Sequence, residues 1–290
     1  MTAPDRVWLV TGAAGGIGMA LLERVLTTGE RVVAASRDIR AFAELVERFG
    51  DAILPVALDV TSQDEARVAV ENALARFGRL DVVVNNAGYA QPGMAEELAD
   101  TALHAQFETN FFGPWNVVRA ALPHLRGRRS GHIIQISSLA GQIGAPGMAA
   151  YVASKHALEG FSLSLAAELR PLGIRVTIVE PGSVRTGFRA RWARRLGPDT
   201  TIPDYDDARA GLRAIVDGVR GAPSDAAAIA DGIAELVDLE NPPDRLPLGA
   251  DAVEEIRRAR TRQLRDIDQY LEFSLRASRE PDPTGSEAPA

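Results

Sequence analysis

The stretch VWLVTGAAGGIG (residues 7–18) joins a short apolar run to a glycine-rich turn. Gly12, Gly16 and Gly18 let the backbone turn sharply and approach a ligand closely, because glycine has no Cβ. The residues that follow have helical spacing, so the N-terminus of a helix would point free amide groups at a bound phosphate. The spacing G-x-x-x-G-x-G is a variant of the dinucleotide-binding fingerprint. This stretch therefore predicts a strand, a phosphate-binding turn and a helix, in that order.

Short apolar runs rich in β-branched residues recur along the rest of the chain. After residues 7–10 they lie at 32–35, 53–58, 82–85, 132–137 and 175–180, with helical spacing between them. Apolar strands that alternate with helices are typical of parallel strands covered on both faces. A helix near 225–239 and a further strand at 245–249 complete the pattern. We expect an α/β fold, a doubly wound Rossmann-type parallel sheet of about seven strands.

The domain organisation follows from where this pattern loosens. We expect a single domain over residues 1–278, with a substrate lid at 181–223, where Gly, Pro and Arg are frequent. Apolar residues from Val253 to Leu275 recur at threes and fours, which predicts an added helical extension over 250–276. That helix would cover the sheet or a neighbouring subunit. Residues 279–290 have the composition of a disordered tail.

Composition excludes several classes of protein. The 290 residues are 46% hydrophobic and 24% charged, as in ordinary globular proteins, and the formal net charge of -7 disfavours a nucleic-acid partner. The chain has no cysteine, which excludes disulfides and thiolate chemistry, and its four scattered histidines predict no metal site. No signal peptide and no long apolar span are evident, so we expect a cytoplasmic protein without a membrane partner.

The stretch YVASK at residues 151–155 raises the question of catalysis. Tyr151 and Lys155 are four positions apart, so on a helix they share one face. A free phenol has a pKa near ~10, and a nearby cation favours its ionised form. A single exposed ammonium would have little effect, so a working pair needs a desolvated cleft. Taken alone, the pair is as readily explained as two solvated neighbours.

Five motifs together settle how the pair is interpreted. TGAAGGIG, NNAG at 85–88, the two serines of ISSLAG, YVASK and EPG at 180–182 occur in the order and spacing of the short-chain dehydrogenase/reductase family, which the chain resembles over roughly residues 5–250. The resemblance implies that Tyr151 is the general acid and base, that Lys155 supports it and binds the nicotinamide ribose, and that Ser138 binds the substrate oxygen. It also implies that Asn110 holds a water linked to Lys155, and that Ser137 has a structural role.

The resemblance also implies a nicotinamide cofactor. Strand two ends in Ser36, Arg37 and Asp38, and a base directly after the small residue favours NADP(H) over NAD(H), because a guanidinium can pair with the 2'-phosphate. Asp38 comes too late to be the acid that binds the ribose in NAD enzymes. The alternative is that these residues form a solvated turn. The other residues expected at the cofactor are Thr11, Gly12, Gly16, Ile17, Gly18, Asp59, Val60, Asn86, Ala87, Gly88, Pro181, Gly182, Val184 and Thr186.

The substrate is less well defined by the sequence. The chain ends in a way that looks more like the hydroxysteroid and retinol dehydrogenase branch than like reductases of acyl carrier substrates. Met148, Phe188 and Trp192, with Val184, are candidate walls of a pocket for a bulky apolar ketone, and each is equally well explained as core. Five arginines between 185 and 195 suggest either a solvated lid or a site for an anionic, carrier-bound substrate.

Three functions are therefore open. The first is an NADP(H)-dependent alcohol dehydrogenase or carbonyl reductase acting on a small-molecule ketone or secondary alcohol. The second is a catalytically silent protein that senses NADP(H), although such proteins typically lose the Tyr or the Lys. The third is a nucleotide-sugar epimerase, which usually has another glycine spacing. Long helices near 101–122 and 149–170 match those through which family members pair, which predicts a homodimer or homotetramer.

Overall fold

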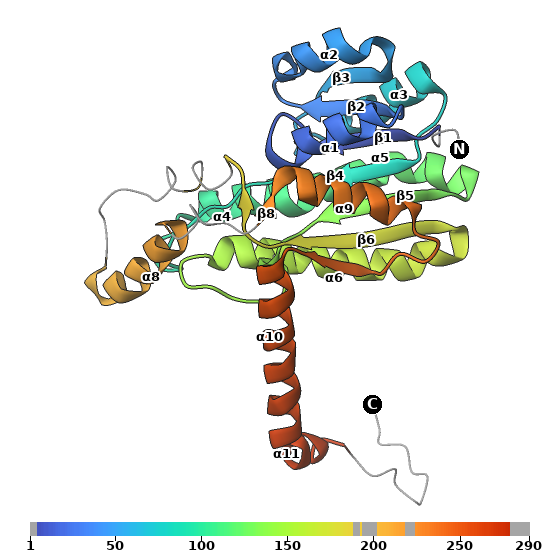
Figure 1. The fold of residues 1–290 in the computed structure, drawn as a ribbon. Coiled ribbons are helices and arrows are strands. Elements are labelled where there is room, and N and C mark those ends of the chain that lie inside the picture. Colours follow the sequence, from blue (N-terminus) through green and yellow to red (C-terminus); the bar gives the residue numbers. More distant parts are fainter. Residues whose placement is uncertain (1–4, 188–191, 193–201, 218–223, 279–290) are drawn as a thin grey trace, which may run out of the picture.

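The computed structural model describes residues 5–187, 192, 202–217 and 224–278. Its centre is a parallel sheet of seven strands in the order β3-β2-β1-β4-β5-β6-β9 (Figure 1). The strands are β1 (Val7–Thr11), β2 (Arg31–Ser36), β3 (Ile53–Ala57), β4 (Val82–Asn85), β5 (Gly131–Ile136), β6 (Ile174–Pro181) and β9 (Arg245–Leu248). The predicted fold class, an α/β Rossmann-type sheet of about seven strands, is confirmed.

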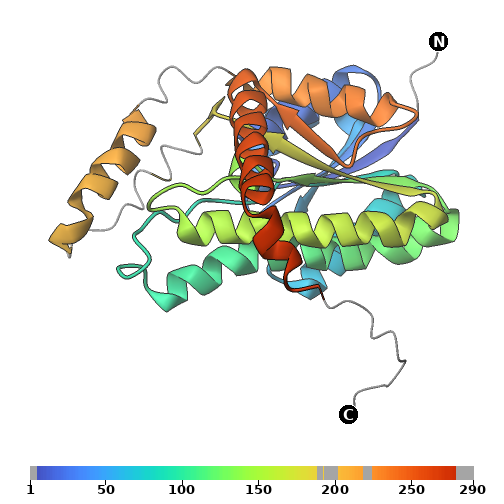
Figure 2. The ribbon, with the colours of Figure 1, turned by 90° about the horizontal axis from the view of Figure 1, so that it is seen from below.

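Helices cover both faces of this sheet (Figure 2). The helices of the body are α1 (Gly16–Thr27), α2 (Ala43–Phe49), α3 (Gln63–Phe77), α4 (Asp100–Phe107), α5 (Gly113–Arg128), α6 (Ala149–Leu169), α8 (Asp206–Asp217) and α9 (Ala226–Asp238). Side chains of α3, α5 and α6 pack on one face, and those of α1, α2 and α9 on the other. Strand β1 serves both layers, since Val7 and Leu9 belong to the first core and Trp8 and Val10 to the second.

The strand order places the ligand-binding edge. Strand β1 lies between β2 and β4, and the chain winds outward to β3 before it crosses back to β4. The connections after β1 and β4 therefore diverge at the carboxyl end of the sheet. In doubly wound sheets, ligands bind at this switch point. The glycine-rich turn follows β1 and the NNAG stretch begins at the end of β4, so the two motifs meet there.

The predicted helix near 101–122 has a finer structure. It is composed of α4, a π-helical turn (Glu108–Phe112) and α5, which continues to Arg128 through Pro123. A π turn inserts one extra residue into the helical repeat, and such turns are frequent at functional sites. Hydrophobic periodicity alone does not report that insertion. Here it contains Asn110, which is fully buried.

Only part of the predicted lid can be described. Strands β7 (Val184–Arg185) and β8 (Ser224–Asp225) form a small parallel pair, and the 3-10 turn Pro203–Tyr205 leads into α8. Phe188 lies outside the described residues, as do Arg189, Arg191, Arg194 and Arg195 of the arginine cluster. The predicted tail at 279–290 also lies outside them. The lid thus stays a prediction.

The helical extension departs from one expectation. It consists of α10 (Ala250–Gln269) and α11 (Leu271–Leu275), and α10 points away from the sheet instead of covering it (Figure 1). Ala252, Ile256 and Ala259 are buried at its base, whereas Ile267 and Leu275 are exposed. Of the two predicted roles, covering the sheet is wrong, because the apolar face of the helix continues beyond the edge of the body, and covering a neighbouring subunit stays a prediction.

Candidate active site

The glycine-rich turn is held against the loop after β4. Thr11 is buried at the end of β1, and its Oγ1 accepts hydrogen bonds from the backbone N–H groups of Asn86 and Ala87, each at 3.1 Å. Gly12 has a positive φ of 61°, and a Cβ there would lie 2.6 Å from the Cα of Ala87. A side chain at this position would push the two loops apart, so the glycine is required by contact as well as by conformation.

The second and third glycines make room for other partners. The Nδ2 of Asn86 donates to the carbonyl oxygens of Thr11 and Gly12, both at 3.0 Å, and a Cβ on Gly18 would lie 2.7 Å from that Nδ2. Gly16 has a φ of 56°, and a Cβ there would lie 3.3 Å from Cγ2 of Thr186. Three predicted cofactor segments, the turn, the NNAG loop and the stretch after β6, are thus in contact.

The N-terminus of α1 fits a phosphate group. The helix begins at Gly16 after Gly15, without a side-chain cap, and no acidic residue lies in its first turn. The space around Gly15 is open, since a Cβ there would meet no heavy atom within 4 Å. Ile17 in the first turn packs against the core and anchors the helix. Free amide groups and open space are what a pyrophosphate needs at this position.

Two neighbouring charged residues after β2, Arg37 and Asp38, have different surroundings. Arg40 holds Asp38 through two side-chain hydrogen bonds of 2.8 Å, and Asp38 also accepts the backbone N–H of Arg40. The Arg40 hydrogen bonds lower the pKa of Asp38 to about 2. Arg37 is exposed and forms no ion pair with any residue in the described part of the chain. Ser36, partly buried, accepts the backbone N–H of Asp38 at 3.4 Å.

The residues after β3 support the adenine side of the predicted site. The Oδ1 of Asp59 accepts the backbone N–H and the hydroxyl of Thr61, at 3.0 and 2.8 Å. Val60 is buried against Gly113, where a Cβ would lie 2.7 Å from Cγ2 of Val60. Asp59 is therefore partly engaged in its own loop, and Val60 packs partly as core.

Tyr151 and Lys155 lie together on a buried face of α6. Lys155 is 5% exposed, and its Nζ donates to the carbonyl oxygen of Ile136 at 2.7 Å, at the carboxyl end of β5. The same Nζ lies 5.9 Å from the centre of the Tyr151 ring, and Tyr151 is 8% exposed. Burial lowers the pKa of Lys155 to about 8, against an opposing effect of Glu159. The pair therefore has the desolvated surroundings that an acid-base device needs.

The loop after β4 reaches this pair. A Cβ on Gly88 would lie 3.2 Å from Oδ1 of Asn110 and 3.7 Å from Nζ of Lys155. Asn110 accepts the backbone N–H of Tyr89 at 3.1 Å and donates to the Tyr89 carbonyl at 2.9 Å. It also donates to Ser154 on α6 at 3.1 Å. Asn110 thus joins the loop to α6 beside Lys155.

Ser137 and Ser138 differ in their surroundings at the end of β5. Ser138 is partly exposed, caps a 3-10 turn and accepts the backbone N–H of Ala140 at 3.2 Å. Ser137 is buried and donates to Oε1 of Glu159 at 2.6 Å. Ser138 is therefore the more accessible of the two serines and Ser137 is held by a buried hydrogen bond, while their roles toward the substrate stay predictions.

A buried polar network lies behind Lys155, and the sequence reasoning missed it. Gln142 Nε2 donates to Glu159 Oε2 and to Glu180 Oε1, both at 2.7 Å. Arg245 donates to the same two carboxylates, which are 2% and 1% exposed. Burial, with the charge of Glu159, raises the pKa of Glu180 to about 7, and burial also raises the pKa of Glu159. One signal was available, since Glu159 is four residues after Lys155 on the same helical face.

The segment after β6 closes the site. The N–H of Gly182 donates to the carbonyl of Leu248 at 3.0 Å, which ties the end of β6, Pro181, to β9. A Cβ on Gly182 would lie 2.1 Å from Oδ1 of Asp251, so a larger residue would require the Asp251 side chain to move. Val184 is buried and pairs with Ser224.

Two of the predicted substrate residues pack around Tyr151. Met148 and Trp192 are buried in a small apolar cluster with Tyr151, Met94 and Leu212, which is separate from the two cores of the sheet. The indole Nε1 of Trp192 is buried without a hydrogen-bond partner among the described residues. The cluster joins α6, the loop after β4 and α8.

The described residues contain neither a cluster suited to a metal ion nor a helix suited to span a membrane. Among residues 5–187, 192, 202–217 and 224–278, no three His, Asp or Glu side chains gather as a metal site would require. Within the same described ranges, no helix combines the length and the apolar character that crossing a bilayer needs.

Comparison with known proteins identifies the family. Residues 6–196 match the family model described as short chain dehydrogenase. Oxidoreductase BOA17 of Botryotinia fuckeliana is 38% identical over 276 residues, 93% of this chain and 98% of that protein. A 3-ketodihydrosphingosine reductase of Bacteroides thetaiotaomicron is 38% identical over 183 residues, 63% of this chain and 65% of that protein.

Solved structures agree with this assignment. A short-chain dehydrogenase from Streptomyces avermitilis has a TM-score of 0.86 and 36% identity, covering 96% of this chain and all of that one. A relative from Burkholderia phymatum in complex with NAD has a TM-score of 0.77 and 25% identity, covering 98% and 99%. One from Burkholderia cenocepacia in complex with NADP has a TM-score of 0.69 and 27% identity, covering 95% and 99%. The chain belongs to the short-chain dehydrogenase/reductase family of oxidoreductases.

Proposed function

We propose that the protein transfers a hydride between NADP(H) and a ketone or secondary alcohol, with Tyr151 as the proton donor and acceptor. The observation that carries this proposal is the burial of Tyr151 and Lys155 together on α6, where Lys155 contacts the loop after β4 and donates to Ile136, two residues before Ser138. When bound, the nicotinamide supplies the hydride. The chain supplies everything else: it holds the substrate, excludes water and moves one proton.

The proton would travel over a short path. In the reductive direction, Tyr151 donates the proton of its hydroxyl to the carbonyl oxygen, and Ser138 donates a hydrogen bond to the same oxygen. The ammonium of Lys155 stabilises the phenolate left behind, and it does so more strongly in a buried site than in water. Asn110 positions the loop and α6 around Lys155 through its three hydrogen bonds.

The preference for NADP(H) is supported by the end of β2. Arg37 is exposed and has no ion-pair partner in the described part of the chain, whereas the nearby Asp38 is held by Arg40. A free guanidinium suits a 2'-phosphate, and a carboxylate held by another arginine is poorly placed to bind ribose hydroxyls. Relatives with NAD and with NADP are both known, so this preference is our inference from these residues.

A bulky apolar substrate is supported by the cluster around Tyr151. Met148, Trp192, Met94 and Leu212 give the surroundings of the Tyr151 ring an apolar character. The reductase from Bacteroides thetaiotaomicron carries the name of a long-chain ketone as its substrate. We infer that a steroid-, retinoid- or polyketide-like ketone fits better than a short polar one.

A reductase acting on a carrier-bound anionic substrate gains no support from Arg185. Its guanidinium forms an ion pair of 3.4 Å with Asp225, and the other four arginines of the cluster lie outside the described residues. The silent sensor protein remains the main alternative. It would bind NADPH without turning over any substrate.

The experiment is a panel of ketones and secondary alcohols assayed with NADPH and NADH, using wild-type protein and Tyr151→Phe. We expect turnover of bulky ketones with NADPH, and a loss of about 10³-fold or more in Tyr151→Phe with nearly unchanged NADPH affinity. Turnover of the variant within a few-fold of wild type would contradict the role of Tyr151. NADPH binding with no turnover on the whole panel would favour the sensor.

We also expect the protein to work as a homodimer or homotetramer in the cytoplasm. Phe112, Trp115 and Leu163 expose apolar surface on the π turn, α5 and α6, the elements predicted to pair. Trp115 and the partly buried Phe161 stack at 4.9 Å between ring centres, which makes this a continuous aromatic surface.

A further inference from the structure

The helical extension is exposed over most of its length. Its base is buried through Ala252, Ile256 and Ala259, but every residue from 260 to 278 is exposed. Leu264 is 62% exposed and Ile267 58%, although both are large aliphatic residues. Figure 1 shows α10 leaving the body of the molecule. Helices in proteins owe most of their stability to packing of an apolar face, and the outer part of this one has no packing partner among the residues that the structure describes.

The apolar residues of α10 form one stripe. Val253 and Leu264 are eleven residues apart, and so are Ile256, which is buried, and Ile267. The helix ends at Gln269, so Leu275 belongs to the separate helix α11. An eleven-residue repeat corresponds to 3.67 residues per turn, close to that of a straight helix, so the stripe stays on one face. The stripe begins where α10 is buried in its own body and continues past the last contact. It is therefore a surface for another helix.

The charged residues along α10 indicate which helix would bind this surface. Residues 257–265 contain five arginines and no acid, whereas residues 266–272 contain three acids and no base. Two copies that pair antiparallel bring each basic segment against the acidic segment of the other. A parallel pair would oppose like charges. We propose that α10 and α11 bind the same helices of a second copy of this chain in antiparallel orientation.

The centre of the pair follows from the spacing. With the two-fold axis between Arg265 and Asp266, Leu264 faces Ile267 of the partner subunit, and each arginine-rich segment faces an acidic one. The Leu264 and Ile267 pair maps onto itself under this symmetry, as a two-fold interface requires. The presence of Asp266, Asp268 and Glu272 beside the apolar residues argues against an anionic membrane as the occupant.

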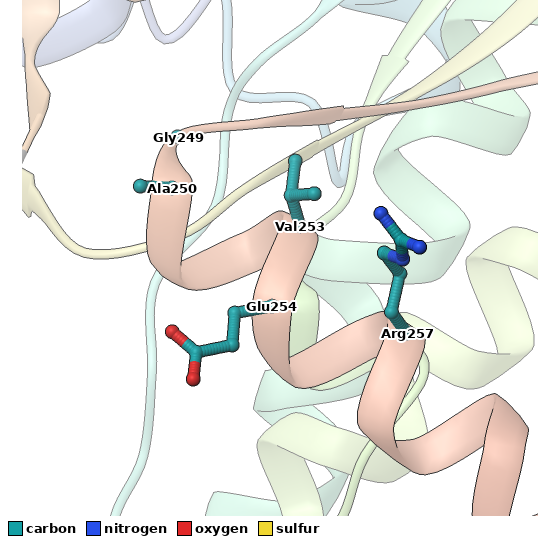
Figure 3. Close-up of a pocket in the computed structure, with 5 residues that line it drawn as sticks. All are labelled: Gly249, Ala250, Val253, Glu254 and Arg257. Atoms are coloured by element: carbon teal, nitrogen blue, oxygen red, sulfur yellow. The ribbon is translucent and has the colours of Figure 1, made fainter.

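The N-terminal end of α10 carries an open surface. A shallow hollow there is lined by Gly249, Ala250, Val253, Glu254 and Arg257 (Figure 3). Val253 and Arg257 project to the same side of α10, and Val253 is 41% exposed. In the antiparallel pair, the C-terminal end of α10 of the partner subunit points toward this hollow.

The first test changes the stripe and measures mass. Leu264→Asp combined with Ile267→Asp should halve the mass seen by light scattering after gel filtration, from tetramer to dimer or from dimer to monomer. The control is Val68→Asp, at a 42% exposed apolar residue on α3, which should leave the mass unchanged. A wild-type monomer, or an unchanged mass in the double variant, would overturn the proposal. So would a wild-type monomer that sediments with anionic phosphatidylserine vesicles.

The second test reads the orientation, and the absence of cysteine from the chain makes it clean. In the antiparallel pair, position 264 lies beside its counterpart at the two-fold axis, whereas the two copies of position 257 lie far apart. Leu264→Cys should form a covalent dimer with a short bismaleimide, while Arg257→Cys should not. The two copies of position 257 are roughly 25 Å apart along the pair, so the linker cannot join them. Cross-linking by Arg257→Cys would indicate parallel pairing and overturn the proposal. None of these residues belongs to the proposed active site, so NADPH binding serves as the control for folding.

Discussion

Two helices of similar length, α6 and α10, show how burial changes what a charged residue does. Helix α6 has 21 residues and α10 has 20. Helix α6 buries Tyr151, Lys155 and Glu159, whereas α10 buries only small or aliphatic residues at its base. A charge in water is screened and has weak interactions, while a desolvated charge strongly affects its neighbours. The charges of α6 should therefore control chemistry, and those of α10 should control association.

The largest effect on turnover should come from removing the buried charge of Lys155. Lys155→Met should lower turnover by about 10³-fold, because the phenolate form of Tyr151 loses its nearby cation and the cofactor loses a contact. Arg262→Met removes an exposed charge from α10 and should leave turnover within a few-fold. Steady-state kinetics on both variants make the comparison. Equal losses in the two variants would show that burial does not distinguish the helices.

Arg37 tests whether an exposed charged residue can distinguish NADPH from NADH. Arg37→Ala should weaken NADPH binding by about tenfold to hundredfold and NADH binding little, because only NADPH brings a 2'-phosphate. Arg40→Ala is the matched control, since Arg40 is already held by Asp38. Titration calorimetry with both cofactors measures the four affinities. Equal weakening of NADPH and NADH by Arg37→Ala would refute the phosphate contact.

Glu159 should act on the reaction through Lys155. Its negative charge raises the pKa of Lys155 against the effect of burial. Glu159→Gln removes that charge, so Lys155 should lose its proton at lower pH and the alkaline loss of turnover should begin about half to one pH unit earlier. Glu168→Gln, an exposed change on the same helix, should leave the pH profile in place. A profile that does not move in Glu159→Gln would remove Glu159 from this role.

The smallest effect concerns stability. The pKa of Glu180 is raised to about 7, so the folded protein keeps a proton that the unfolded chain loses above pH 4.5. The free energy of unfolding should therefore fall as the pH rises through this window. Glu180→Gln should reduce that fall and raise Tm by a few degrees at pH 8, as followed by thermal denaturation.

Two other titratable residues, His132 and Glu235, help to interpret this measurement. Burial lowers the pKa of His132 to about 3, which makes stability rise with pH up to the ordinary pKa of histidine. That opposing slope is present in wild type and variant alike, so their difference isolates Glu180. The exposed Glu235→Gln should behave as wild type. The same slope in Glu180→Gln as in wild type would indicate that the folded protein does not hold this proton.

The strands and the Tyr151–Lys155 pair could be predicted because their signals are local. Buried parallel strands are apolar throughout, and a four-residue spacing on a helix fixes a shared face. The π turn around Asn110 was missed, because one inserted residue leaves the apolar pattern of the flanking helices intact. The direction of α10 was missed too, since periodicity defines an apolar face but not what covers it.

The polar network behind Lys155 could not be derived from spacing alone. Glu159 lies on α6, Glu180 on β6 and Arg245 on β9, and only the parallel pairing of β6 with β9 brings them together. In the sequence, each is an ordinary charged residue. Their protonation depends on burial, which is a property of the assembled fold.

The most direct test of the account is to follow the hydride itself. With NADPH carrying deuterium at the transferable position of its nicotinamide, and a ketone accepted in the panel, mass spectrometry of the alcohol should find one deuterium on the former carbonyl carbon. Tyr151→Phe should bind the labelled cofactor and form almost none of this product. Wild-type protein that binds the cofactor but never transfers the label, or a variant that transfers it at the wild-type rate, would contradict the account.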